Sequence, residues 1–186
     1  TPSINNRIGV LPFYENKGGR PDKTFSHGIP FVIFDALEST SPAILHPYLT
    51  QEAVQRLGIS NEALAEKASL ETIAKDLNAP FLIFGSYQIT HRGTLRAIVN
   101  VYNGKSKKIL SPAQTFESPF DDAFFTHLID SVKLAFASDR SLPQVKVSDV
   151  RPPSMQVFRE YAQGLGNAQR YNSNALSLAA VWLSKA

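Results

Sequence analysis

Residues 81–84 have the sequence Phe-Leu-Ile-Phe and constrain the fold more than any other stretch of the chain. Neighbouring side chains of a strand point to opposite faces of the sheet, so a wholly apolar run needs cover on both faces. Pro80 opens this run, and residues 85–89 continue it as a strand. The run therefore predicts a strand inside a sheet that is buried on both sides.

The composition is sufficient for one packed core. The chain has 186 residues, of which 43% are hydrophobic and 19% charged, which suits one full domain with part of a second. The formal net charge of +3 is too small to indicate nucleic-acid binding by itself. The absence of cysteine excludes disulfides, thiolate nucleophiles and cysteine-ligated metals. No apolar stretch approaches the roughly 18–20 residues of a membrane span.

The other hydrophobic patterns predict helices packed on a mixed sheet, the α/β (α+β) class. Pro47 predicts that the second strand is an edge strand, and residues 14–23 are predicted to form a loop. Asn103-Gly104 is a strong hairpin signal within an antiparallel meander. The strands are expected at 8–13, 44–49, 81–89, 95–102 and 108–116. The helices are expected at 26–40 with Ser26 as the N-cap, at 50–57 with Thr50 as the N-cap, and from Ser60 or Asn61. Further helices are expected at 69–77, ended by Asn78, and from Ser118 or Asp121 to about 137.

A separate helical segment is predicted after the meander and its closing helix. Residues 139–153 contain three prolines and are interpreted as a linker. Two apolar stripes then follow at helical spacing on either side of a break at 171–174, which predicts a helical hairpin. The stripes are Met155, Phe158, Ala162 and Leu165, followed by Leu176, Ala179 and Leu183.

Two motifs resemble the amino-terminal α/β domain of TolB-like proteins. The first is the stretch Ile-Gly-Val-Leu-Pro-Phe at 8–13 with Asn16 three residues on, and the second is a helix over 73–78 that leads into the strand ending in Gly85-Ser86. Ser26-His27-Gly28 stands where that family usually has an acidic residue before the glycine of the first helix. The resemblance covers about 5–138 and implies a periplasmic protein.

The last segment resembles the opening of a tetratricopeptide array. Ala179, Leu183 and Ala186 follow the spacing of the second helix of such a repeat. The predicted organisation is a TolB-like domain at 1–138, a linker at 139–153 and a tetratricopeptide-like hairpin at 154–186. The hairpin is interpreted as a truncated repeat or as a single cap, and the start at Thr1 as trimming or as removal of an export signal.

The polar residues form no recognisable catalytic or metal-binding set. The four histidines show no pair at metal-ligand spacing, and Ser86 lacks the turn motif of a hydrolase nucleophile. Asp121 and Asp122 are expected to complement the amino terminus of their own helix. Lys105, Lys107 and Lys108, with Arg92 and Arg96 on the adjoining strands, are expected to protect a sheet edge rather than to bind nucleic acid. We therefore predict no enzyme activity, no cofactor and no metal.

Two functional hypotheses follow. The first is a non-catalytic protein-interaction or scaffold domain of the bacterial envelope, periplasmic or associated with the outer membrane, with other envelope proteins as partners. Its candidate binding residues are Tyr161, Leu165, Tyr171 and Trp182, for which burial within the protein is the alternative. The second is a small-ligand or anion sensor that uses the loop after the first strand, with Arg20, Lys23 and His27 as candidate residues.

Overall fold

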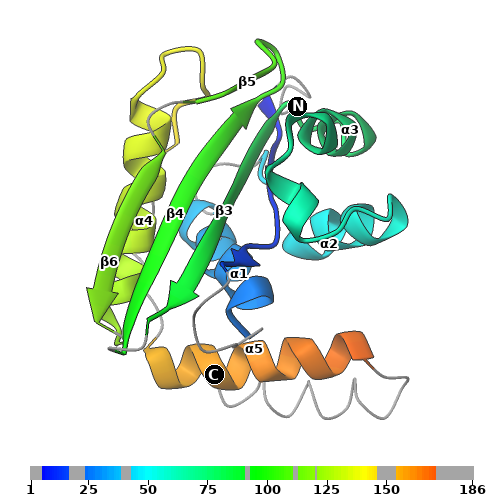
Figure 1. Cartoon of the computed structure of the whole chain (residues 1–186). Coiled ribbons are helices and arrows are strands. Elements are labelled where there is room, and N and C mark those ends of the chain that lie inside the picture. Colours follow the sequence, from blue (N-terminus) through cyan, green and yellow to red (C-terminus); the bar gives the residue numbers. More distant parts are fainter. Residues whose placement is uncertain are drawn as a thin grey trace.

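The computed structural model describes residues 6–16, 24–38, 43–90, 93–110, 113–119, 121–145 and 154–170 (Figure 1). Within these ranges the chain forms six strands, five α-helices and a short 3-10 helix. In chain order the elements are β1 (Ile8–Val10), β2 (Tyr14–Glu15), α1 (Thr24–Glu38), α2 (Pro47–Arg56), η2 (Glu62–Ala65), α3 (Lys67–Asp76), β3 (Phe81–Ile89), β4 (Thr94–Asn103), β5 (Lys108–Ile109), β6 (Gln114–Pro119), α4 (Ala123–Ala137) and α5 (Met155–Arg170).

The strands form one mixed sheet in which β3 is central. β1 and β2 pair with β3 in parallel, while β4 pairs with β3 antiparallel from Phe81↔Asn103 to Ile89↔Leu95. On its other edge β4 pairs antiparallel with both β5 and β6. The predicted fold class, with helices on a mixed sheet that includes an antiparallel meander, is confirmed.

Helices cover both faces of this sheet (Figure 1). One core lies between the sheet and α1, α4 and α5, and contains Phe81 and Ile83 of β3. A smaller core lies between the sheet and α2, η2 and α3, and contains Leu82 and Phe84. All four side chains are at most 2% exposed, so the two-sided burial predicted for residues 81–84 is confirmed.

Gly85 of β3 lies in close contact with the backbone of β4. A Cβ atom at this position would lie 2.0 Å from the carbonyl oxygen of Ile98 and 2.5 Å from the Phe13 ring. No side chain fits there, because such distances are far inside van der Waals contact. The glycine of the Gly85-Ser86 motif is therefore required by sheet packing.

The prediction that residues 14–23 form only a loop is wrong at its start. Tyr14–Glu15 forms β2, which pairs in parallel with Ser86 and Tyr87. Asn16 extends this contact, since its backbone N–H donates to the Tyr87 carbonyl oxygen at 2.8 Å and its side chain donates to Ser86 Oγ at 3.0 Å. This strand depends on a partner about 70 residues away, which local patterns do not reveal.

The predicted strand at 44–49 is also wrong. Only Ile44 forms a bridge, with Ile8, and Pro47 begins α2. Proline is well suited to the first helical turn because its missing N–H would have no helical acceptor there. Thr50, expected to cap this helix, is instead fully buried within it, and its hydroxyl donates to the Val10 carbonyl oxygen at 2.6 Å.

Helix α1 begins at Thr24, two residues before the predicted cap Ser26. Pro30 therefore lies in the helix interior, where it has no N–H to donate to the Ser26 carbonyl oxygen. The backbone N–H of Phe13 donates to that oxygen instead, at 3.1 Å. This bond satisfies the helix carbonyl and ties α1 to the end of β1.

Other boundaries differ by a few residues. The expected strand at 108–116 is divided into β5 and β6, and α3 begins at Lys67 rather than at Ser69. Ser118 lies in β6, while Asp121 Oδ1 accepts a hydrogen bond from the Ala123 N–H at 3.0 Å, as expected of a residue before α4. No helix in the described part of the chain is long and apolar enough to cross a membrane.

Helix α5 packs on α1 and extends the larger core. Met155, Phe158 and Ala162 are buried in that core, and the Phe158 ring lies 4.9 Å from the Phe25 ring. A Cβ atom on Gly28 of α1 would lie 2.6 Å from Phe158, so the missing side chain permits the close contact. The second helix of the predicted hairpin, at 176–186, lies outside the described residues, and the division of the chain at 139–153 stays a prediction.

Candidate protein-interaction surface

Five aromatic side chains meet where α1, the start of α2 and α5 come together. Phe31 is at their centre, with ring centroids 5.5 Å from His46, 5.2 Å from Tyr48 and 5.5 Å from Tyr161, all in edge-to-face contact. Phe34 contacts His46 at 5.0 Å, and the His46 and Tyr48 rings stack at 5.2 Å. Together with the neighbouring Leu49, these residues form what we call the aromatic patch. Its members are Phe31, Phe34, His46, Tyr48, Leu49 and Tyr161.

The patch has a buried base and an exposed outer layer. Phe31 is 2% exposed and Phe34 is 8% exposed, whereas Tyr48 is 41% exposed and Leu49 is 49% exposed. Exposed aromatic and aliphatic groups supported from below by buried rings are held in place before a partner arrives. Tyrosine is also enriched among the residues that contribute most to protein–protein binding.

The start of α2 fixes the exposed residues of the patch. His46 is the N-cap residue, and its Nδ1 atom accepts a hydrogen bond from the Tyr48 N–H at 3.3 Å. Thr50 anchors the same turn to β1 through its bond to the Val10 carbonyl oxygen. Tyr48 and Leu49 lie between these two attachments, so their backbone is restrained on both sides.

Burial raises the pKa of Tyr48 and of Tyr161 above the ordinary value. The negative charge of Asp35 raises the pKa of Tyr161 further, which places that carboxylate close to the patch. Both phenols are therefore neutral at physiological pH, able to donate and to accept hydrogen bonds. Asp35 is exposed beside the patch, whereas Glu52, exposed on the next turn of α2, forms an ion pair with Arg56 at 3.6 Å.

Of the four predicted binding residues, Tyr161 belongs to the patch, where it is half-buried. Leu165 lies in α5, but its side chain is outside the described part of the structure, and Tyr171 and Trp182 lie outside the described residues altogether. These three stay predictions.

The predicted anion loop cannot be assembled from the described residues. Arg20 and Lys23 fall outside them, while His27 lies half-buried in α1. The anion-sensing hypothesis therefore stays a prediction.

Local sequence patterns do not reveal most of the patch. His46, Tyr48 and Leu49 were assigned to an edge strand, which would have separated them from the helix that carries Phe31. The signal that was available is His46-Pro47, an N-cap residue followed by a proline at the first helical position.

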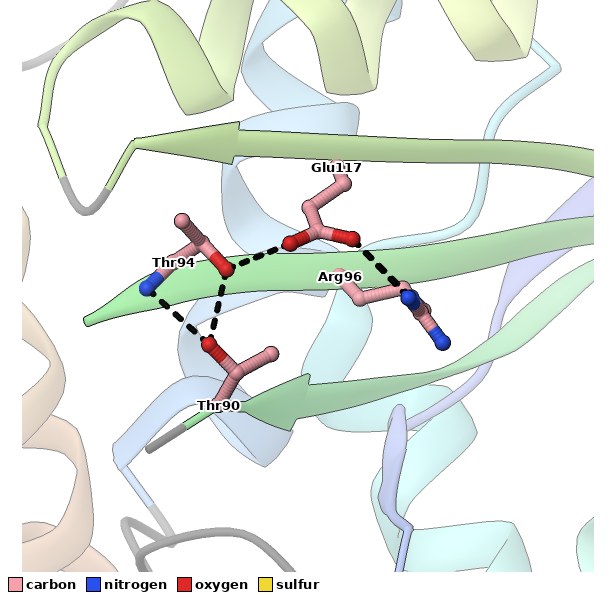
Figure 2. A network of polar contacts seen from close by, with 4 residues as sticks. All are labelled: Thr90, Thr94, Arg96 and Glu117. Carbon is pink, nitrogen blue, oxygen red and sulfur yellow. Dashed lines mark hydrogen bonds and ion pairs between the residues drawn. The ribbon is translucent and has the colours of Figure 1, made fainter. Parts of the chain in front are cut away.

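Apart from the aromatic patch, a cluster of polar side chains lies at the end of the β3–β4 hairpin and reaches β6 (Figure 2). Glu117 accepts hydrogen bonds from Thr94 Oγ1 at 2.6 Å and from Arg96 Nη2 at 2.9 Å, while the Thr90 and Thr94 hydroxyls lie 2.8 Å apart. Arg96 and Glu117 face each other directly across β4 and β6. Their side chains are about half exposed, so we interpret the cluster as a cross-strand contact of modest strength.

The described residues contain no group of three or more His, Asp or Glu side chains that could hold a metal ion. Asp122 lies at the N-cap position of α4, but its side chain makes no capping hydrogen bond to that helix. Its Oδ1 atom instead accepts a hydrogen bond from the Met155 N–H at 2.6 Å. This aspartate therefore supports the start of α5.

Comparison with known proteins found similar solved structures only. No family model matches the chain, and no curated protein matches it. The LpoB C-terminal domain from Salmonella enterica is 13% identical with a TM-score of 0.46, covering 62% of this chain and 83% of that domain. Lipoprotein GNA1162 from Neisseria meningitidis is 13% identical with a TM-score of 0.49, covering 72% of this chain and 98% of that protein. Escherichia coli LpoB is 13% identical with a TM-score of 0.48, covering 61% of this chain and 56% of that chain.

The resemblance to TolB-like proteins with a tetratricopeptide hairpin is therefore wrong, because the similar structures belong to other proteins and no family model matches. The motifs that suggested it have a general structural cause. Leu11 to Phe13 end the parallel strand and enter the core, and Gly85 permits the close approach of two strands. The stripe on α5 packs against α1, which explains its helical spacing without a repeat.

Proposed function

We propose that this chain is a non-catalytic protein-interaction domain of the bacterial cell envelope, and that it binds a partner protein through the aromatic patch. The observation that carries the proposal is the exposed Tyr48, whose ring lies 5.2 Å from the buried Phe31 ring, with the exposed Leu49 next to it in the chain. Among the described residues, few large apolar side chains are as exposed as these, and two of them are adjacent. A preformed apolar surface of this kind is typical of a binding site for another protein.

The chemistry of the patch favours binding over catalysis. A phenol with a raised pKa is a poor nucleophile at neutral pH, because almost none of it is ionised. His46 uses Nδ1 to accept from the backbone of Tyr48, and its ring is stacked on Tyr48. These contacts serve to position the exposed side chains.

The partner that fits this surface presents an apolar side chain next to a lysine or arginine. The apolar group would lie against Tyr48 and Leu49, and the basic group would face the exposed carboxylate of Asp35. The phenol groups of Tyr48 and Tyr161 would supply hydrogen bonds at the border between the two. Charge complementarity of this kind increases the association rate and selects the partner.

The test compares two exposed leucines on different helices. Leu49→Asp places a charge in the patch, while Leu134→Asp places the same charge on α4, where the leucine is 58% exposed. A photoreactive residue at position 49 crosslinks the partner in cells, and mass spectrometry identifies it. The purified partner is then titrated against each variant, and its affinity is measured. We expect Leu49→Asp to weaken binding at least tenfold, about 1.4 kcal/mol or more, and Leu134→Asp to leave it unchanged.

Equal affinity of the two variants for the purified partner would refute the proposal. A crosslink only to a second copy of the chain, with a matching change in sedimentation, would replace it with a self-association surface. The envelope location is tested separately, by fractionating cells that express the full-length protein. Recovery in the cytoplasm alone would remove that part of the proposal.

A further inference from the structure

An open pocket of about 490 Å³ lies between α3 and the turn that joins β4 to β5. This turn is at the opposite end of the sheet from α5, and so away from Tyr161 of the aromatic patch (Figure 1). The volume is within the range of pockets that bind small molecules. The lining residues that the argument uses are Glu71, Lys75, Tyr102, Gly104, Lys105 and Lys107.

The wall on the β4–β5 side is held in place by the backbone. The Gly104 N–H donates to the Pro80 carbonyl oxygen at 2.6 Å, and a Cβ atom on Gly104 would lie only 2.9 Å from that oxygen. Asn103 Oδ1 accepts from the backbone N–H groups of Lys105 at 3.0 Å and of Ser106 at 3.3 Å. The turn is therefore preformed, and binding a ligand would not require it to fold.

Tyr102 supplies a polar group to the pocket. It lines the pocket although the residue is only 1% exposed, and its hydroxyl makes no hydrogen bond to any residue in the described ranges. Burial, followed by the negative charge of Glu71, raises the pKa of Tyr102. Glu71 lines the same pocket and also forms an ion pair with Lys67 at 3.9 Å, so the phenol and this carboxylate are available to one ligand from the same side.

The rim of the pocket is cationic. Lys105 Nζ is held 5.0 Å from the centre of the Phe81 ring and donates to Asn6 Oδ1 at 3.3 Å. Lys75 and Lys107 form no ion pair with another described residue. The sequence predicted a role in edge protection for Lys105 and Lys107. It did not predict that Lys75 and Glu71 of α3 line the same pocket as these lysines.

We propose that this pocket binds a small zwitterion of the amino-acid class, either a free amino acid or a short peptide. A carboxylate of the ligand would be held by Lys75 and Lys107, and its ammonium group would be held by Glu71 and the Tyr102 oxygen. The pocket is lined by side chains of both signs, so each charge of such a ligand has an oppositely charged group available. A purely anionic ligand would leave Glu71 facing a like charge.

The experiment titrates the full chain with four probes while backbone amide NMR signals are recorded. The probes are glutamate, the dipeptide Ala-Glu, succinate as a dicarboxylate without an ammonium group, and putrescine as a dication. We expect saturable shifts at Thr72, Asn78 and Gly104 with glutamate or Ala-Glu, with a Kd on the order of 1 mM or tighter. A preference between these two probes separates a free amino acid from a peptide as the source.

Matched variants assign the contacts. The double variant Lys75→Gln, Lys107→Gln is expected to weaken binding at least about tenfold, whereas Lys133→Gln on α4 leaves it unchanged. Glu71→Gln is expected to remove the preference for glutamate over succinate, and Tyr102→Phe to weaken binding without unfolding the chain.

Two results would overturn the proposal. One is the absence of saturable shifts around the pocket with any probe, while the amide spectrum shows that the chain is folded. The other is equal binding of glutamate and succinate by the unaltered chain. Neither result bears on the aromatic patch, whose partner binding is measured with the leucine variants.

Discussion

Asp122, at the start of α4, accepts a hydrogen bond through Oδ1 from the backbone N–H of Met155, the first residue of α5, at 2.6 Å. Ser154 caps the same helix locally, since its Oγ atom accepts from the Val157 N–H at 3.2 Å. The first turn of α5 therefore has one local acceptor and one from a distant part of the chain. A carboxylate in this position also interacts favourably with the positive end of the helix dipole.

Replacing Asp122 should loosen α5. We expect Asp122→Ala to lower the free energy of unfolding by about 1 kcal/mol, the usual value of a helix cap, and Asp122→Asn to have a smaller effect because an acceptor oxygen remains. Urea denaturation measures the change, and amide hydrogen exchange at residues 155–158 locates it. Asp130→Ala, which removes an exposed partner of Lys133 on α4, is the control and should change stability by less.

Gly28→Ala should destabilise the contact between α1 and α5. Alanine favours a helix more than glycine does. Its Cβ atom, however, would lie 2.6 Å from the Phe158 ring and 3.0 Å from the Cβ atom of Ala162. We expect the free energy of unfolding, measured by urea denaturation, to fall by about 1–3 kcal/mol, as for overpacking of a core. In the double variant with Phe158→Leu, the total loss should be smaller than the sum of the two single losses. A stabilising Gly28→Ala would show that the helices are not in this contact.

Thr50→Val should show how much the hydroxyl group of this residue, as distinct from its shape, contributes to the stability of the fold. The buried hydroxyl donates to the carbonyl oxygens of Val10 at 2.6 Å and of Pro47 at 2.8 Å, and valine retains the volume but cannot donate. We expect a loss of about 1–3 kcal/mol in thermal or urea unfolding, because the Val10 carbonyl would lose its donor from α2. Thr50→Ser keeps the hydroxyl and should retain more stability than valine. Equal stability of the two variants would contradict the role assigned to this bond.

The patch tyrosines should make stability fall at high pH. Burial is the main cause that raises the pKa of Tyr161 above 10.0, followed by the charge of Asp35, so the unfolded chain loses the phenol proton first. The associated stability is present in full below pH 10.0 and declines as the pH rises from there toward the folded-state pKa. Urea unfolding across this range should show a shallower decline for Tyr161→Phe than for the unaltered chain. Tyrosinate absorbance provides the independent check, with the chain in urea as the reference. If the folded and unfolded chains titrated together, the packing of Tyr161 against Phe31 would be contradicted.

Local patterns were sufficient wherever the physical cause lies within a few residues. The apolar run at 81–84 predicted a strand with both faces covered, and the apolar stripe that begins Met155, Phe158 and Ala162 predicted the buried side of α5. Asn78, predicted to end a helix, follows the C-cap Leu77 of α3 and has a φ of 48°, a conformation that asparagine tolerates. Periodicity and turn chemistry determine such features because neighbouring residues produce them.

Local patterns were insufficient where the partner comes from elsewhere in the chain. The strand β2 exists because Ser86 and Tyr87 lie beside it, and Pro30 is tolerated inside α1 because the Phe13 N–H occupies the free carbonyl oxygen. The aromatic patch is not predicted because His46 and Tyr48 form it only through ring contacts with Phe31, which lies on another helix.

The sequence by itself therefore determined the class of fold, the central strand and the apolar sides of its helices, because burial of a local pattern is enough to produce them. Only the tertiary structure decided where α2 begins, which acceptor supports the start of α5, and which side chains meet in the aromatic patch and in the lysine-lined pocket. The physical reason is that hydrogen bonds and ring contacts act over a few ångströms. Residues far apart in the chain come within that range only after the layers have packed.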